Sequence, residues 1–177
     1  MWVEGRQLID NLLSCEKPIV SVVNGYAMGL GANYALLADV VFATPTAIFA
    51  DTHVRVGMGA GDGGQLIWPL LMGVNRAKYF MMTGERVNAH QALELGLVNF
   101  VCDADQALDE ALALADRLAS GPQMAIRASK VGINAYMRLV ASIVMPVSMR
   151  AEELCMHSPD REESRAALRE NREPRFE

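Results

Sequence analysis

The chain has 177 residues, of which 51% are hydrophobic, and carries a formal net charge of −5 at pH 7. This composition is typical of a folded globular protein, and the acidic balance argues against a nucleic-acid-binding surface, which needs clustered Lys and Arg. The three cysteines, Cys15, Cys102 and Cys155, are spaced too widely for a disulfide framework or a zinc site, and we expect no metal. We find neither a signal peptide nor an apolar run of about 18 residues, so we expect a cytoplasmic protein with no membrane partner.

The first part of the chain alternates helical and strand patterns. Apolar residues at helical spacing predict an amphipathic helix over residues 1–14, which ends before Lys17 and Pro18. The runs that follow predict, in order, a strand at 18–23, a helix at 31–38, and strands at 39–44 and 47–50.

The second part of the chain is mainly helical. The predicted elements are helices at 65–72 and 75–82, a short helix that starts at the capping box of Asn88 and Gln91, a strand at 97–101, and helices at 103–119, 122–140, 149–156 and 160–169. Pro146 predicts a break or kink near Met145. We therefore expect an α/β core over residues 1–102 and a helical region over residues 103–177.

The first glycine-rich turn, residues 24–33 (NGYAMGLGAN), lies between a predicted strand and a predicted helix. Such a junction directs backbone N–H groups and the positive end of the helix dipole at one point. A carbonyl oxygen that becomes an enolate or a tetrahedral oxyanion is stabilised at such a point, so the turn indicates carbonyl chemistry. Asn33, in the first turn of the helix, either reaches the same pocket as a hydrogen-bonding group or faces solvent.

The second glycine-rich turn, residues 57–64 (GMGAGDGG), matches the dinucleotide-binding pattern at Gly59, Gly61 and Gly64, with Glu85 about twenty residues on. That fingerprint needs a buried strand directly before it and a strand after one helix. Here the preceding residues 54–56 are few and contain Arg55, and two helices are predicted to follow. The pattern is therefore a weak indication of nucleotide binding.

His53 lies between the two turns, and Asp62 lies inside the second one. A carboxylate beside an imidazole holds the ring in one tautomer and raises its basicity for proton transfer. If the loop folds back, the two side chains meet and form such a pair. The alternatives are a histidine packed under a loop and an aspartate that serves as a turn residue or as the N-cap of the following helix.

Several co-linear motifs resemble the crotonase superfamily of enoyl-CoA hydratases and isomerases. They are KPIVSVVNGYAMGLG, ALLADVVFAT, AIFADTHVRVGMGAGDGG and RAKYFMMTGERVNAHQALELGLVNFV. The resemblance implies a spiral of ββα units, here shortened at its N-terminus, and a helical C-terminal region that mediates assembly into a homotrimer or a dimer of trimers. It also implies an acyl-CoA thioester substrate, with coenzyme A as its only cofactor-like part. The thioester carbonyl would bind an oxyanion hole that includes the N–H of Leu30, between Gly29 and Gly31.

The chain departs from the hydratases of this superfamily at two positions. Those enzymes use two glutamates where this chain has Asn33 and His53. His53 with Asp62 instead resembles the branch of C–C-bond hydrolases, such as 6-oxocamphor hydrolase, in which a His–Asp pair activates water against a β-diketone. We thus predict catalytic roles for Asn33, His53 and Asp62, with hydrolysis of a β-diketone as the alternative reaction.

The resemblance also implies that superfamily members carry about half a domain more before the first helix. A truncated, non-catalytic family member that serves assembly is therefore a further alternative. Met58, Trp68 and Tyr34 are candidate pocket-lining residues. Arg172 and Arg175 either meet coenzyme phosphates or are solvated charges of the tail.

Overall fold

The computed structural model describes residues 2–176, and their side chains from residue 5 onward. The helices are α1 (Trp2–Ser14), α2 (Leu30–Leu36), α3 (Gly64–Met72), α4 (Val74–Thr83), α5 (Ala89–Glu94), α6 (Ala107–Ala119), α7 (Gln123–Met156) and α8 (Pro159–Glu170), with one 3-10 helix, η1 (His53–Val56). The strands are β1 (Val20–Val23), β2 (Tyr26–Met28), β3 (Val40–Ala43), β4 (Ile48–Ala50), β5 (Val87–Asn88) and β6 (Phe100–Val101). The helix predicted over residues 1–14 is thus confirmed from residue 2, and Met1 lies outside the described residues.

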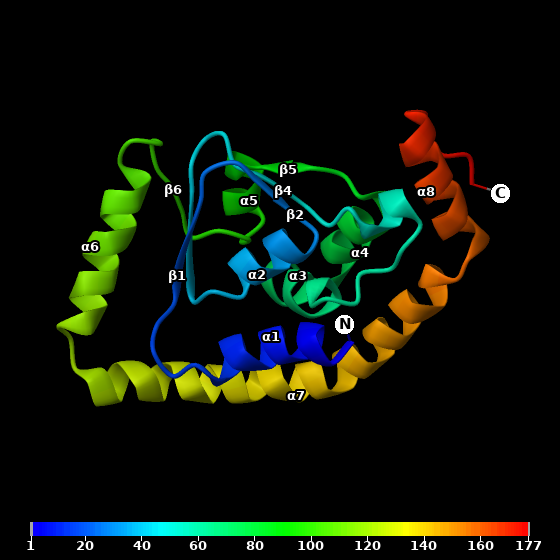
Figure 1. The fold of residues 1–177 in the computed structure, drawn as a ribbon. Coiled ribbons are helices and arrows are strands. Elements are labelled where there is room, and N and C mark those ends of the chain that lie inside the picture. The colour runs from blue at the N-terminus through cyan, green and yellow to red at the C-terminus, as the bar shows by residue number, and fades with distance from the viewer. Residues whose placement is uncertain (1, 177) are drawn as a thin grey trace.

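The strands form two small sheets. One has the order β1-β3-β6 and is parallel throughout; the other has the order β2-β4-β5, in which β2 and β4 are parallel and β5 is antiparallel. Strands β1 to β4 alternate between the two sheets along the chain, and helices follow the pair β1–β2 and the pair β3–β4 (Figure 1). β5 stays in the sheet of β4, and α5 separates it from β6. This is the predicted ββα spiral, and the α/β fold class is confirmed.

A single core joins the sheets to α1, α2, α3 and α7. Trp68, Phe49, Ile9 and Leu36 are almost fully buried in it. α7 runs along the base of the molecule with α1 packed against it, and α6 stands against β1 and β3 (Figure 1). The C-terminal helices therefore cover the core. The predicted division of the chain into an α/β core over residues 1–102 and a helical region over residues 103–177 stays a prediction.

α7 is continuous through Pro146, so the break predicted near Met145 is wrong. Proline removes one backbone donor and crowds the carbonyl four residues earlier, which bends a helix without ending it when packing holds both sides. Met145 and Ser148 are buried on the two sides of the proline. The ribbon of α7 turns upward toward α8 in its orange part (Figure 1), which agrees with the predicted kink.

α7 is also long and apolar enough to cross a membrane by length and composition, contrary to our expectation for the sequence. Core helices of soluble proteins meet the same criterion. Here α7 packs against α1 and α3, while Tyr136, Leu139, Ile143 and Val147 are exposed. Some apolar residues of α7 thus pack in the core, and others form an uncovered face.

Candidate active site

The two glycine-rich turns meet at His53. β2 and β4 pair in register, Met28 with Ala50, so the turn that follows β2 lies beside η1, which follows β4. Gly29 donates its N–H to the Ala50 carbonyl (2.9 Å) and adopts φ 52°. A Cβ at Gly29 would lie 3.3 Å from Cε1 of His53. Glycine is needed here for both its backbone conformation and the close approach of the imidazole.

His53 lies between two aspartates. Its Nδ1 lies 2.7 Å from Oδ1 of Asp51, and its Nε2 lies 3.2 Å from Oδ2 of Asp62. The His53 and Asp62 side chains are about 15% exposed, whereas that of Asp51 is 1% exposed. The loop thus folds back as predicted, and it leaves His53 and Asp62 accessible to a small molecule.

This environment sets the charge of the imidazole. Burial by itself lowers the pKa of His53, but the hydrogen bonds to Asp51 and Asp62 and the negative charges of both raise it to about 10. His53 is therefore an imidazolium at neutral pH. In this state it can donate a proton.

Asn33 is fully buried, so the alternative of a solvent-facing helix residue is wrong. Its Nδ2 donates to Oδ1 of Asp62 (2.7 Å), and its Oδ1 accepts from Nε1 of Trp68 (2.9 Å). Trp68 is also fully buried, so the prediction that it lines a substrate pocket is wrong. Trp68 thus donates to Asn33, and Asn33 donates to Asp62, so these two hydrogen bonds hold the Asp62 carboxylate in place. They can form because α2, which carries Asn33, packs against α3, which carries Trp68.

Two acidic residues of the site were not predicted from the sequence. Asp51 comes directly after β4, and its Oδ2 is buried without a hydrogen-bond partner among the described residues. Glu152 comes from α7 and packs on Gly61, where a Cβ would lie 2.9 Å from Glu152 Cβ. Burial and the charges of Asp62 and Asp51 raise the pKa of Glu152, against the opposing effect of His53. The sequence holds a signal only for Asp51, which lies two residues before His53 at the end of a strand.

The glycines of the second turn allow these approaches. Gly64 begins α3 directly against the carboxylate of Asp51 and the amide of Asn33, where a Cβ would clash. Gly63, and not Asp62, is the N-cap of α3, so the capping alternative for Asp62 is wrong. A 3-10 helix precedes the turn and two helices follow it, which does not fit the dinucleotide-binding fingerprint.

The remaining candidates lie around this centre. Leu30 is the first residue of α2, and Leu30, Gly31 and Tyr34 are exposed and line one cleft. Met58 lines a separate cleft of about 460 Å³ between the second turn and the two helices α3 and α4. Leu30 and Met58 therefore line two separate clefts.

The two arginines of the tail bind acidic residues of the same region. Arg172 pairs with Glu163 and Glu170, and the backbone N–H of Arg175 donates to Glu163 (2.7 Å). Hydrogen bonds from Arg172 and Arg175 lower the pKa of Glu163 to about 2. A role for these arginines toward coenzyme phosphates stays a prediction.

Asp51, His53 and Asp62 also offer possible metal ligands, since one atom of each lies within 4.8 Å of the others. In the structure the two ring nitrogens of His53 instead face the two carboxylates, as hydrogen-bond donors do. The expectation of a site without metal stays a prediction.

Comparison with known proteins agrees with this architecture. The family model described as enoyl-CoA hydratase/isomerase matches residues 1–177. A crotonyl-CoA hydratase of Syntrophomonas wolfei is 33% identical over 97% of this chain and 66% of its own length. A crystal structure of an enoyl-CoA hydratase/isomerase from Mycobacterium paratuberculosis has a TM-score of 0.90 and 34% identity, covering 94% of this chain and 66% of that one.

The name of a third relative states a different activity. The structure of a β-diketone hydrolase from the cyanobacterium Anabaena has a TM-score of 0.82 and 31% identity, covering 87% of this chain and 62% of that one. The chain thus spans about two thirds of the length of the relatives that it matches. Since the family model matches the whole chain, the chain belongs to the enoyl-CoA hydratase/isomerase family, within the crotonase superfamily.

Proposed function

We propose that this chain acts on an acyl-CoA thioester by stabilising an enolate, with the His53–Asp62 pair in place of two glutamates. The observation that carries the proposal is the position of His53, hydrogen-bonded between Asp51 and Asp62 and in contact with Gly29 at the start of α2. Names of relatives such as crotonyl-CoA hydratase support the substrate class.

In this proposal the N–H of Leu30 polarises the thioester carbonyl, because the first amides of a helix lack partners within it. Asp62 accepts a proton from water, which adds to the β-carbon, and the His53 imidazolium donates a proton to the α-carbon of the enolate. Asp62 then passes the proton that it gained from water to His53 across their 3.2 Å contact. This transfer restores both groups to their starting states. Asp51 and Asn33 are positioning residues, since neither is exposed to a substrate.

The second candidate function is hydrolysis of a C–C bond in a β-diketone. The named activity of the Anabaena relative favours it, and the same groups would serve. Asp62 would then activate water against a carbonyl, and the carbon–carbon bond would break to leave an enolate that takes the proton of His53. The two reactions differ in where oxygen from water ends: in a hydroxyl group or in a carboxylate.

Mass spectrometry of products formed in ¹⁸O-labelled water tests this proposal. The purified chain is incubated with crotonyl-CoA, a β-keto acyl-CoA and a cyclic β-diketone. Label in a hydroxyacyl-CoA supports hydration, and label in a carboxylate from a cleaved bond supports the second candidate. No labelled product from a folded chain would favour the non-catalytic alternative.

The matched variants are His53→Gln and His90→Gln, since His90 is an exposed histidine of α5. We expect His53→Gln to reduce turnover at least about a hundredfold, as loss of general acid–base catalysis does, and His90→Gln to leave it unchanged. Equal turnover in the two variants would exclude His53 from the reaction.

We further propose that the chain acts in the cytoplasm as a homotrimer or a dimer of trimers. The support is the uncovered apolar face of α7, on which Tyr136, Leu139, Ile143 and Val147 follow one another at helical spacing and are 59% to 68% exposed. A face of this kind is typical of an interface between subunits.

A further inference from the structure

Helix α3 borders the candidate active site from inside the core. Gly64 and Trp68 lie four residues apart on α3, which places them on the same face of the helix. A Cβ at Gly64 would clash with Oδ2 of Asp51 and lie 3.1 Å from Nδ2 of Asn33. One turn further along, Trp68 donates its indole N–H to Oδ1 of Asn33 (2.9 Å). This face of α3 therefore touches the buried side of the site at two points.

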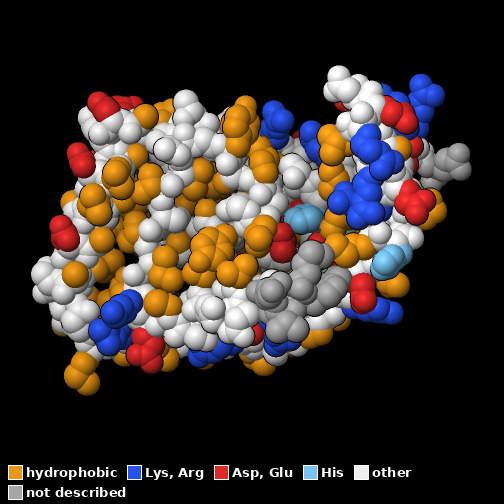
Figure 2. Space-filling view, viewed as in Figure 1, with side chains coloured by type: hydrophobic (Ala, Val, Ile, Leu, Met, Phe, Trp, Pro, Cys, Tyr) orange, Lys and Arg blue, Asp and Glu red, His pale blue; other side chains and the backbone are white. Residues whose placement is uncertain are grey.

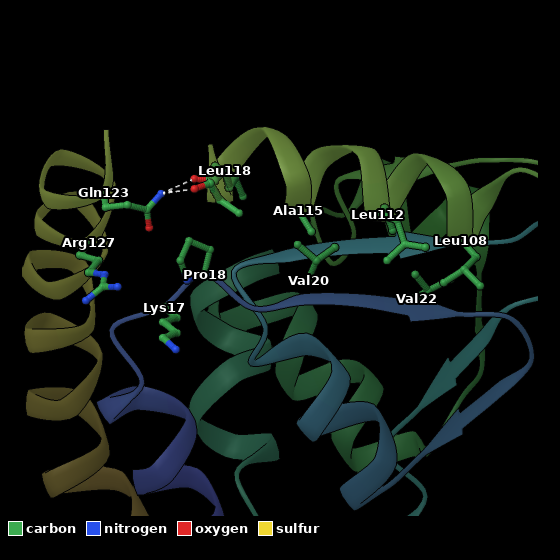
Figure 3. Close-up of a pocket in the computed structure, with 12 residues that line it drawn as sticks. Lys17, Pro18, Val20, Val22, Leu108, Leu112, Ala115, Leu118, Gln123 and Arg127 are labelled. Carbon is green, nitrogen blue, oxygen red and sulfur yellow. Dashed lines mark hydrogen bonds between the residues drawn. The ribbon is translucent and has the colours of Figure 1, made fainter. Parts of the chain in front are cut away.

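Trp68 itself is closed off from solvent. Its side chain is fully buried, and its ring lies against that of Phe80 of α4, with the ring centroids 6.4 Å apart. It lines neither the cleft of about 460 Å³ beside Met58 nor the cleft of about 440 Å³ between α6 and β1, whose lining side chains are drawn in Figure 3. Figure 2 shows a hollowed, mostly hydrophobic surface over α6 and charged side chains over α8, and Trp68 contributes to neither. Trp68 can therefore act on a substrate only through the residues that it touches.

The indole N–H determines which atom of the Asn33 amide faces Asp62. An indole nitrogen only donates, so the atom of Asn33 that faces Trp68 is its oxygen. The amide nitrogen then faces the other way, where it donates to Oδ1 of Asp62 (2.7 Å). With the amide reversed, two donors would meet at Trp68 and two acceptors would meet at Asp62. Because Asn33 is fully buried, bulk water does not replace a partner that its amide loses.

Asp62 thereby has a partner on each of its carboxylate oxygens. Oδ1 accepts from Asn33, and Oδ2 lies 3.2 Å from Nε2 of His53. Rotation of the carboxylate out of this plane would lengthen both contacts, and hydrogen bonds to a charged group are among the stronger ones in proteins. The amide of Asn33 therefore holds the carboxylate of Asp62 against the imidazole.

The position of Asp62 affects the titration of His53. Burial lowers the pKa of His53, and the hydrogen bonds and charges of Asp51 and Asp62 raise it to about 10. Glu152 of α7 is the third carboxyl group close enough for its charge to interact with His53. If Asp62 moved away while Asp51 and Glu152 stayed in place, the imidazolium would lose one of its stabilising charges, and its pKa would fall.

We propose that Trp68 is a positioning residue of this site: its indole N–H fixes the orientation of the Asn33 amide, and the amide fixes the Asp62 carboxylate against His53. In the proposed reaction Asp62 takes a proton from water, so these hydrogen bonds also place the accepting group. The effect on turnover rests on the proposed function. The effects on the Asn33 amide and on the titration of His53 do not, because both are measured without substrate.

Replacement of Trp68 by 3-benzothienylalanine tests the proposal. A sulfur atom takes the place of the indole N–H, so the donor is lost while the shape of the side chain is retained. Trp68→Phe is the second variant and removes the same donor. Tyr79→Phe is the matched control, because it removes a hydrogen-bond donor from another aromatic ring, the exposed Tyr79, which donates to Glu85 outside the site (2.9 Å).

The first readout is the pH titration of His53, followed by ¹⁵N NMR of its ring. We expect a midpoint near pH 10 in the wild type and in Tyr79→Phe. In both Trp68 variants we expect a midpoint lower by about one pH unit, which is about a tenfold weaker affinity for the proton. The second readout is hydrogen exchange of the Asn33 side-chain amide, which should be at least about tenfold faster in the Trp68 variants than in the control, as expected when a hydrogen bond worth about 1.4 kcal/mol or more is lost.

The third readout is turnover. We expect kcat of the Trp68 variants to fall about tenfold to a hundredfold, as misplacement of a reacting group does, with KM unchanged because Trp68 does not touch the substrate. A wild type without turnover, combined with the expected change in the His53 midpoint, would contradict the proposed function and support the role of Trp68.

Three results would overturn the proposal. One is an unchanged His53 midpoint in the folded benzothienylalanine variant, and another is an equal change in Tyr79→Phe. The third needs no variant: an indole N–H of Trp68 that exchanges with solvent in the wild type as fast as an exposed one would show that its hydrogen bond to Asn33 is absent in solution.

Discussion

At the scale of single residues, the charge of His53 distinguishes this site from a pair of glutamates. Its two ring nitrogens both face carboxylates, and these outweigh the burial that would otherwise lower its pKa. The sequence predicted a pair with Asp62 that relays a proton to or from water, but it did not predict Asp51, the second carboxylate beside the ring. The proton is retained because two negative charges surround one imidazole.

The raised pKa of His53 predicts a pH dependence of stability. The folded state holds the proton up to about pH 10, whereas an unfolded histidine loses it near 6.5. Stabilisation by the imidazolium is therefore complete below pH 6.5 and is lost as the pH rises toward 10. We expect the free energy of unfolding, measured by urea titration, to fall more steeply over this range in the wild type than in His53→Gln. Parallel curves for the two proteins would show that His53 titrates normally.

At the scale of elements, the second glycine turn is held against α7, and this contact brings Glu152 to the site. Gly61 is buried there, and a Cβ added to it would meet the Glu152 side chain. Gly59 of the same turn has only Cys155 Sγ near it, 4.0 Å from the position of a Cβ. The capping box of Asn88 and Gln91 that starts α5 was predicted correctly, because both of its hydrogen bonds are local in sequence.

This contact predicts different effects for two similar substitutions. Gly61→Ala places a methyl group against Glu152 Cβ and should destabilise the protein by about 1–3 kcal/mol, as overpacking does. Gly59→Ala is the control and should change the free energy of unfolding by less than about 0.5 kcal/mol, as a substitution with room for its methyl group does. Chemical denaturation of both variants measures this. Equal stability of the two would mean that α7 does not pack on the turn in solution.

At the scale of the whole molecule, the β1 edge of the β1-β3-β6 sheet and the apolar face of α7 are uncovered among the described residues. The first is an edge of a sheet and the second a helix face, so they call for different partners. An edge binds another strand through backbone hydrogen bonds, whereas a helix face binds through side-chain packing.

The proposed assembly through α7 predicts the effect of a charge on that face. Ile143→Asp should reduce the mass of the oligomer to that of the monomer, because an ionised side chain is costly to bury in an apolar interface. Met124→Asp, at the start of the same helix and 90% exposed, should leave the mass unchanged. Light scattering coupled to gel filtration measures both. A monomeric wild type, or an Ile143→Asp variant of unchanged mass, would contradict assembly through this face.

The sequence by itself determined the features that depend on neighbouring residues: the strand–turn–helix around Gly29 and the helix cap at Asn88. Short-range turn and capping chemistry encodes these directly. Only the tertiary structure decided that Asn33 is buried beneath the site, that Glu152 joins it from α7, and that α7 continues through Pro146. Each of these depends on packing between elements distant in the chain, which supplies or withholds the partners that a local pattern does not contain.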